Sequence, residues 1–259
     1  PRYWARHSPV LFPIVGRVWN NVYRCGGKEY TLSQHGFARD MDFQPTYEEE
    51  NAVIYTLESN EDTMKVYPFP FVLEIGYRLK GNRIEVMWSV QNTGDQVMDF
   101  QIGAHPAFYY RNLDVQTDER AFLDFGSGTK QLEYISPAEK GCVSDKRHTL
   151  KLQDGLMDIN SHSFDCDTYI FGNSQVKKIT LMDKLKRPYV SLEFNSPLVA
   201  VWSPSAVHPD VPFICIEPWY GRCDKVGYHG DFKDREWMQH LEPGKSFDAG
   251  YSIILEDVK

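Results

Sequence analysis

Apolar and polar residues alternate one by one through much of the chain, the pattern of β-strands that bury one face. The clearest run is 71–79, in which Phe, Leu, Ile, Tyr and Leu alternate with Val, Glu, Gly and Arg. The alternation resumes over 84–90, after a Lys80-Gly81-Asn82 turn in which glycine can adopt a positive φ. These two runs predict a β-hairpin.

Shorter runs of the same character predict strands along the whole sequence. They cover 52–57, 98–102, 121–125, 168–171, 178–182, 189–194, 198–202, 213–216 and 247–255. One short helix is predicted over 234–241. Many short strands separated by Gly and Pro turns are typical of an all-β protein, here a large antiparallel β-sandwich or a barrel. Without a repeat or a linker, the chain is predicted to form a single domain over 1–259.

Composition narrows the class of partner. The 15 Tyr, 15 Phe and 6 Trp exclude a disordered chain, and the net charge of −8 argues against nucleic acid. No apolar run is long enough to cross a bilayer, so no membrane partner is expected. The five cysteines are irregularly spaced and contain no Cys-x-x-Cys pair, which predicts free thiols, no metal site and a cytoplasmic protein.

Four segments place polar residues beside Gly or Pro where neither a strand nor a helix pattern explains them. They are SPVLFPIVGR (8–17), QHGFARD (34–40), IGAHPAF (102–108) and FICIEPWYG (213–221). Two prolines make the first a poor strand, so Arg17 is predicted to lie on an ordered loop.

The last of these segments carries the strongest chemical signal. Glu217 ends an apolar strand, where a low dielectric favours its neutral form unless partners hold it charged. Trp219 and Tyr220 follow it, and their flat faces suit the C–H faces of a sugar ring. In the third segment, His105 has an ordinary pKa suited to proton transfer near neutrality.

Each of these residues also has an ordinary structural explanation. A histidine before proline is commonly a satisfied structural residue, and Glu217 could cap a turn or pair with an arginine. Arg17 and Arg39 could anchor loops, and His35 could hydrogen-bond within one. Residue types and spacing alone therefore predict no more than an all-β domain with features of sugar binding.

Taken together and in order, the motifs resemble the aldose 1-epimerase (galactose mutarotase-like) superfamily, most closely its LacX-like branch. The matching text also includes LSQHGFARDMDF (32–43), WSVQNTGD (88–95), FICIEPWYGRCD (213–224) and LEPGKSF (241–247). Members usually have a further strand-containing segment before the part that begins here at Pro1. We therefore expect the chain to lack its native N-terminal segment.

The resemblance implies a large antiparallel β-sandwich with a sugar cleft on a concave face. It implies an isomerase that interconverts the α and β anomers of an aldohexose with neither cofactor nor metal. His105 matches the general acid that protonates the ring oxygen, and Glu217 the base that removes the anomeric hydroxyl proton. In these roles, His105 starts protonated and Glu217 ionised.

The resemblance also suggests residues that bind the substrate. His35 matches a second family histidine that contacts the sugar, and Asp167 in DCDTYIF (165–171) matches a substrate-binding aspartate. Arg17 and Arg39 lie in motifs that resemble a phosphate-facing arginine pair in hexose-6-phosphate mutarotases. Trp219 completes the predicted site.

One departure affects the choice of sugar. Galactose mutarotases carry Asn-Arg a few residues after their Gly-Arg, whereas this chain has Trp19-Asn20-Asn21 there. Galactose is therefore not implied, and Arg39 is a candidate replacement from a different loop.

Three alternatives to a free-sugar epimerase stay open. A hexose-6-phosphate 1-epimerase would use the arginines, and a non-catalytic carbohydrate-binding or sensing protein would use the same fold and aromatics. A glycosidase fits less well, because it usually needs two facing carboxylates. In each case the expected partner is a small-molecule sugar, bound by a monomer or homodimer.

Overall fold

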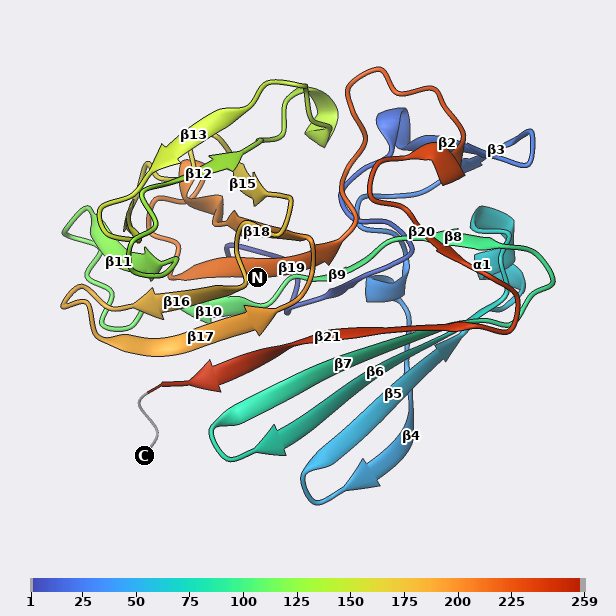
Figure 1. Ribbon diagram of the computed structural model, residues 1–259, viewed down its shortest axis with the longest axis horizontal. Helices are drawn as coiled ribbons and strands as arrows, with labels where there is room; N and C mark the ends of the chain where they lie inside the picture. Colours follow the sequence, from blue (N-terminus) through green and yellow to red (C-terminus); the bar gives the residue numbers. More distant parts are fainter. Residues whose placement is uncertain (1, 257–259) are drawn as a thin grey trace.

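The computed structural model describes residues 2–256 and contains two large antiparallel sheets (Figure 1). The nine-stranded sheet contains, in spatial order, β14 (Leu156–Asn160), β11 (Glu119–Asp124), β16 (Lys178–Met182), β17 (Pro188–Phe194), β21 (Ser246–Leu255), β7 (Arg83–Asn92), β6 (Phe71–Lys80), β5 (Ala52–Glu58) and β4 (Gln44–Glu49). The six-stranded sheet contains β1 (Val10–Leu11), β9 (Ile102–Ala104), β19 (Phe213–Tyr220), β18 (Leu198–Trp202) and β15 (Thr168–Phe171), with β10 (Ala107–Tyr109) also paired to β19. The predicted all-β class is confirmed.

Smaller elements surround the two sheets. Three two-stranded pairs are β2 (Val22–Cys25) with β3 (Lys28–Thr31), β12 (Gln131–Tyr134) with β13 (His148–Lys151), and β8 (Met98–Phe100) with β20 (Gln239–Leu241). One α-helix, α1 (Glu61–Val66), and short 3-10 turns at Trp19–Asn21, Ala38–Asp40, Glu139–Gly141, Pro204–Ala206 and Phe232–Asp234 complete the described elements. No helix in the described range is both long and apolar enough to span a membrane.

The predicted hairpin is confirmed as β6 and β7. Lys80 pairs with Arg83, and Gly81 turns the chain with φ +61°. Phe71 and Leu73 of β6 are fully or almost fully buried, while the far ends of both strands extend away from the rest of the molecule (Figure 1). The alternation of apolar and polar residues therefore identified both the two strands and the face that they bury.

The helix predicted over 234–241 is wrong. This stretch contains the end of a 3-10 turn, Trp237 at φ +64°, and strand β20, which pairs with β8. A tryptophan in the left-handed region cannot continue a right-handed helix. Met238 and Leu241 are instead buried against the core around β8.

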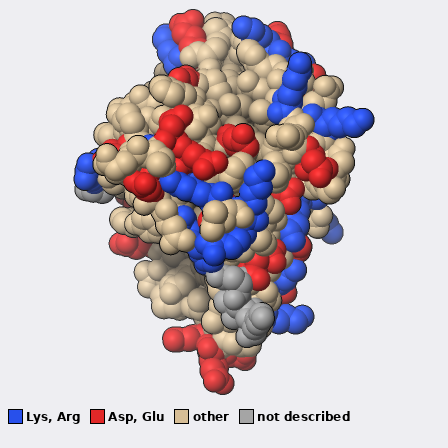
Figure 2. Space-filling view, turned by 90° about the vertical axis from the view of Figure 1, so that its left-hand side faces the viewer, with Lys and Arg blue, Asp and Glu red and all other residues tan. Residues whose placement is uncertain are grey.

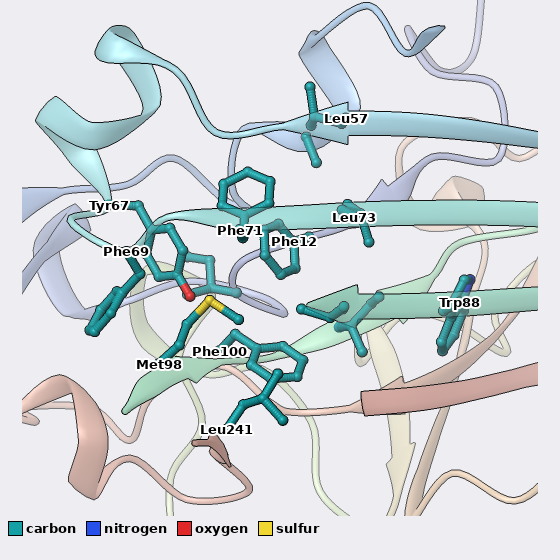
Figure 3. Close-up of a cluster of buried hydrophobic side chains, with 14 of the residues drawn as sticks. Phe12, Leu57, Tyr67, Phe69, Phe71, Leu73, Trp88, Met98, Phe100 and Leu241 are labelled. Atoms are coloured by element: carbon teal, nitrogen blue, oxygen red, sulfur yellow. The ribbon is translucent and has the colours of Figure 1, made fainter. Parts of the chain in front are cut away.

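Two hydrophobic clusters fill the space between the sheets. One lies over β5, β6 and β7 and includes the rings of Phe12, Tyr67, Phe71 and Phe100 (Figure 3). The other joins β11, β16 and β17 to the six-stranded sheet, where Ile214 and Ile216 of β19 contribute to it. Because side chains alternate along a strand, residues 215, 217 and 219 of β19 point to the opposite face of that sheet.

The surface is of mixed charge (Figure 2), and the cysteines form no disulfides among the described residues. Acidic and basic side chains are interspersed on the face drawn in Figure 2. All five cysteines are free, as predicted: Cys25, Cys142, Cys166, Cys215 and Cys223.

Candidate active site

A pocket of about 260 Å³ lies on the face of the six-stranded sheet that points away from the nine-stranded sheet. Six of the seven predicted site residues line it: His35, Arg39, His105, Asp167, Glu217 and Trp219. They come from loops and strands far apart in the sequence, so the fold gathers them at one place. The seventh, Arg17, lines an adjoining hollow.

Strand register brings His105 and Glu217 face to face. On one side of them Gly103 pairs with Trp219, and on the other Ala107 pairs with Cys215. His105 therefore lies opposite Glu217 at the break between β9 and β10. Its Nε2 is 3.3 Å from Oε1 of Glu217, and the two side chains are 9% and 2% exposed.

Burial decides the protonation of this pair. It lowers the pKa of His105 to about 3 and raises the pKa of Glu217 well above its ordinary value. Trp219 opposes the rise in the Glu217 pKa, whereas the charge of Asp167 adds to it. Both shifts favour neutral forms, so the pair holds one proton, and holds it on Glu217. This differs from the charged starting pair expected from the family roles, because desolvation outweighs the contribution of the neighbours.

His35 is fixed by two hydrogen bonds to one residue. The backbone N–H of Gly16 donates to His35 Nδ1 at 3.1 Å, and the backbone N–H of His35 donates to the Gly16 carbonyl at 2.7 Å. Because Nδ1 accepts, the ring proton is on Nε2. The His35 ring centroid lies 5.7 Å from that of His105, edge to face.

The loop around His35 needs an unusual backbone. His35 and Gly36 have φ values of +64° and +70°. A Cβ at residue 36 would lie 2.2 Å from the carbonyl oxygen of Phe12, so glycine is required by both conformation and space.

The two arginines have different surroundings. Arg39 lies in the 3-10 turn Ala38–Asp40, and its side chain is 13% exposed. Its Nε is 3.9 Å from Oδ2 of Asp40 and makes no hydrogen bond. Burial, reinforced by Arg6, lowers the pKa of Arg39. Arg17 instead donates to the side-chain oxygens of Asn21 and Gln34.

Asp167 occupies the boundary between the pocket and the hollow beside Arg17. It lines both, has a φ of +73°, and accepts a 2.6 Å hydrogen bond from the Thr168 hydroxyl. It thus places a second carboxylate in the pocket that holds Glu217. The family resemblance implies only a substrate-binding role for Asp167.

Two tryptophans of the pocket were missed by the sequence analysis. The Trp4 ring lies 4.7 Å from the His105 ring at 35°, and the Trp202 ring lies 5.4 Å from it, edge to face. Trp202 pairs with Cys215, so it lies beside the strand of Glu217 in the predicted 198–202 strand. Trp4 has no periodic neighbours in the sequence that could have identified it.

Comparison with known proteins identifies the family. Residues 1–253 match the family model for aldose 1-epimerase. The chromosomal LacX protein of Lactococcus lactis subsp. lactis is 26% identical over 264 residues, which cover 98% of this chain and 87% of that protein. The similarity confirms the LacX-like resemblance.

Solved structures agree in fold. A galactose mutarotase related enzyme from Lactobacillus acidophilus has 34% identity and a TM-score of 0.89, covering 100% of this chain and 86% of its own. A galactose mutarotase-like protein from Lactobacillus casei has 27% identity and a TM-score of 0.88, with coverages of 98% and 87%. The fold, the ordered motifs and these matches together show that the chain belongs to the aldose 1-epimerase family.

Proposed function

We propose that this protein is an aldose 1-epimerase that interconverts the α and β anomers of an aldohexose, with His105 and Glu217 moving the protons. The observation that carries the proposal is their 3.3 Å contact on the wall of a pocket large enough for several water molecules or a sugar. The family match supports the same reaction class.

The reaction needs one acid and one base. The acid protonates the ring oxygen while the base takes the anomeric hydroxyl proton, the C1–O5 bond breaks, and an aldehyde forms. Rotation about C1–C2 then presents the other carbonyl face to the C5 hydroxyl, and closure returns both protons. Each proton transfer contributes roughly 10²–10⁴-fold to the rate.

One proton shared by His105 and Glu217 is enough for this catalytic cycle. His105 and Glu217 together begin and end with one proton, so turnover consumes no other proton donor. A sugar can favour the ionised form of Glu217 by donating a hydroxyl hydrogen bond to Oε2, which has no partner in the described structure. His105 would then carry the proton and serve as the acid.

Other pocket residues are suited to hold the ring. Trp4, Trp202 and Trp219 supply aromatic surface, and His35 supplies an Nε2–H donor. Asp167 adds an acceptor for sugar hydroxyls. The five free thiols support a cytoplasmic location for such an enzyme as part of this proposal.

Polarimetry of freshly dissolved α-glucose and α-galactose tests the proposal. Wild-type protein should accelerate the approach to the equilibrium rotation of at least one sugar, and His105→Gln should not. Sugar binding by the wild type, measured calorimetrically, without any acceleration would instead establish a carbohydrate-binding protein.

A hexose-6-phosphate 1-epimerase is a second candidate, favoured by the partly buried Arg39 side chain, whose buried Nε has no hydrogen bond. Such a group suits a phosphate oxygen. Arg39→Ala should then lower the rate on glucose 6-phosphate much more than the rate on glucose. Equal losses on the two sugars would remove the phosphate role.

Asp167 also revives the glycosidase alternative, because it places a second carboxylate in the pocket of Glu217. The contact between His105 and Glu217 favours the epimerase. Release of nitrophenol from nitrophenyl glycosides, lost in Asp167→Asn, would reverse that preference.

A further inference from the structure

Cys215 adds a third metal-binding type of side chain beside the proton-transfer pair. It precedes Glu217 by two residues on β19, so both side chains leave the same face of the sheet. One ligand atom each from His105, Cys215 and Glu217 lie within 4.8 Å of one another. All three residues are buried.

The spacing is close to that of a tetrahedral zinc site. Zinc bonds of about 2.0–2.3 Å to N, O and S ligands separate neighbouring ligand atoms by roughly 3.3–3.8 Å. The 3.3 Å between His105 Nε2 and Glu217 Oε1 already meets this spacing. The Cys215 sulfur lies within 4.8 Å of the ligand atoms of His105 and Glu217. A shift of about an ångström at most would bring it to the upper end of the zinc ligand spacing.

A second observation points independently to a ligand. Oε2 of Glu217 and Nδ1 of His105 are buried without a hydrogen-bond partner, and the residues are 1% and 7% exposed. A buried polar atom without a partner is costly, and a cation bound to the Glu217 carboxylate would offset that cost. His105 and Glu217 line the pocket, which gives a cation a route to them, whereas Cys215 is not among the lining residues.

We propose that His105, Cys215 and Glu217 form a binding site for Zn²⁺, or for a cation of similar softness, and that the bound ion inhibits the epimerase. The inhibition rests on the proposed function, whereas the binding does not. A thiolate, an imidazole and a carboxylate favour Zn²⁺ over Mg²⁺ or Ca²⁺, which prefer sets of oxygen ligands.

Coordination would stop proton transfer directly. The Cys215 thiol and the Glu217 carboxyl would each release a proton to solvent, and His105 would bind through a neutral ring nitrogen. The lone pairs that exchange protons with the sugar would then be held by the ion. Because protons leave on binding, inhibition should strengthen as the pH rises.

Cobalt(II) gives a test of binding that does not depend on activity. Titration of Co²⁺ into the full chain should give a thiolate-to-cobalt charge-transfer band that saturates near one equivalent. Cys215→Ser, which keeps the side-chain size, should lose this band. Cys142→Ala, which removes another buried cysteine that does not line the pocket, should keep it. A band that survives in Cys215→Ser, or no band in the wild type, overturns the site.

Zn²⁺ inhibition is measured by polarimetry on the same proteins. Wild type should be inhibited and recover on addition of a chelator, and Cys215→Ser should need at least about tenfold more Zn²⁺ for the same inhibition. Equal sensitivity of the two proteins overturns the inhibitory role. A wild type without mutarotase activity removes the proposed function, while the cobalt spectrum still decides the site.

Discussion

His105 and Glu217 meet because the two segments that flank them pair with β19 in a single register. Gly103 faces Trp219 and Ala107 faces Cys215, which leaves His105 opposite Glu217 with 3.3 Å between Nε2 and Oε1. Burial then pushes the pKa of His105 down and that of Glu217 up. A pair that shares one proton follows from this arrangement.

The pH dependence of kcat/KM should show a broad plateau. Activity needs one proton on the pair, and a second proton binds only near the pKa of His105, about 3. Activity should fall on the alkaline side, as pH rises through the raised pKa of Glu217. An acidic limb near pH 6.5, the ordinary value for histidine, would contradict the buried pair.

Glu217→Gln should become more stable relative to the wild type as the pH rises. Folded Glu217 keeps a proton that the unfolded chain releases above its ordinary pKa, so wild-type stability falls between that value and the raised folded pKa. The advantage of Glu217→Gln should grow by about 1.4 kcal/mol per pH unit in this window. Urea unfolding of both proteins at several pH values measures it, and a difference that does not change with pH would exclude the shift.

Gly36→Ala should be strongly destabilising and should lower activity. The new Cβ would meet the Phe12 carbonyl and displace His35. Gly26→Ala is a matched control, because Gly26 also has a positive φ, +56°, but nothing lies within 4 Å of its Cβ position. The left-handed backbone costs roughly 1–3 kcal/mol in both variants. Equal unfolding free energies for the two variants would show that the close contact is relieved without cost.

Much of the fold was predictable because alternation is a local signal. The β6–β7 hairpin and β19 were recognised from residues that are neighbours in the sequence. Strand β4 was not recognised, because it is an edge strand whose residues are all exposed and which lacks an apolar face. Helix α1 was also missed, although Asn60 and Thr63 form a capping box at its start.

The site was predictable only through the ordered motifs. No local pattern reveals that His105 and Glu217 face each other, because their contact depends on pairing between segments over 100 residues apart. The direction of the Glu217 pKa shift was foreseen from its place in a buried strand. The packing of the Trp4 ring against His105 was not predictable, because it depends on tertiary contacts of the N-terminal segment. One of these contacts is the hydrogen bond that the Tyr3 hydroxyl donates to Asp210.

Trp4→Ala should expose His105 to water. Weaker desolvation would raise the pKa of His105 towards its ordinary value, so the acidic limb of the kcat/KM profile should move to higher pH. Trp4→Phe, which keeps an aromatic cover, should move the limb much less. An unchanged limb in Trp4→Ala would show that Trp4 does not contribute to the burial of His105.

A double-mutant cycle on kcat shows whether His105 and Glu217 act as one unit in proton transfer. His105→Gln and Glu217→Gln should each lower kcat for anomer exchange by roughly 10²–10⁴-fold. The double variant should be no slower than the slower single variant, because either change already disables the shared proton transfer. Losses that multiply in the double variant, or a single variant that keeps the wild-type rate, would show that the two residues do not share the proton transfer.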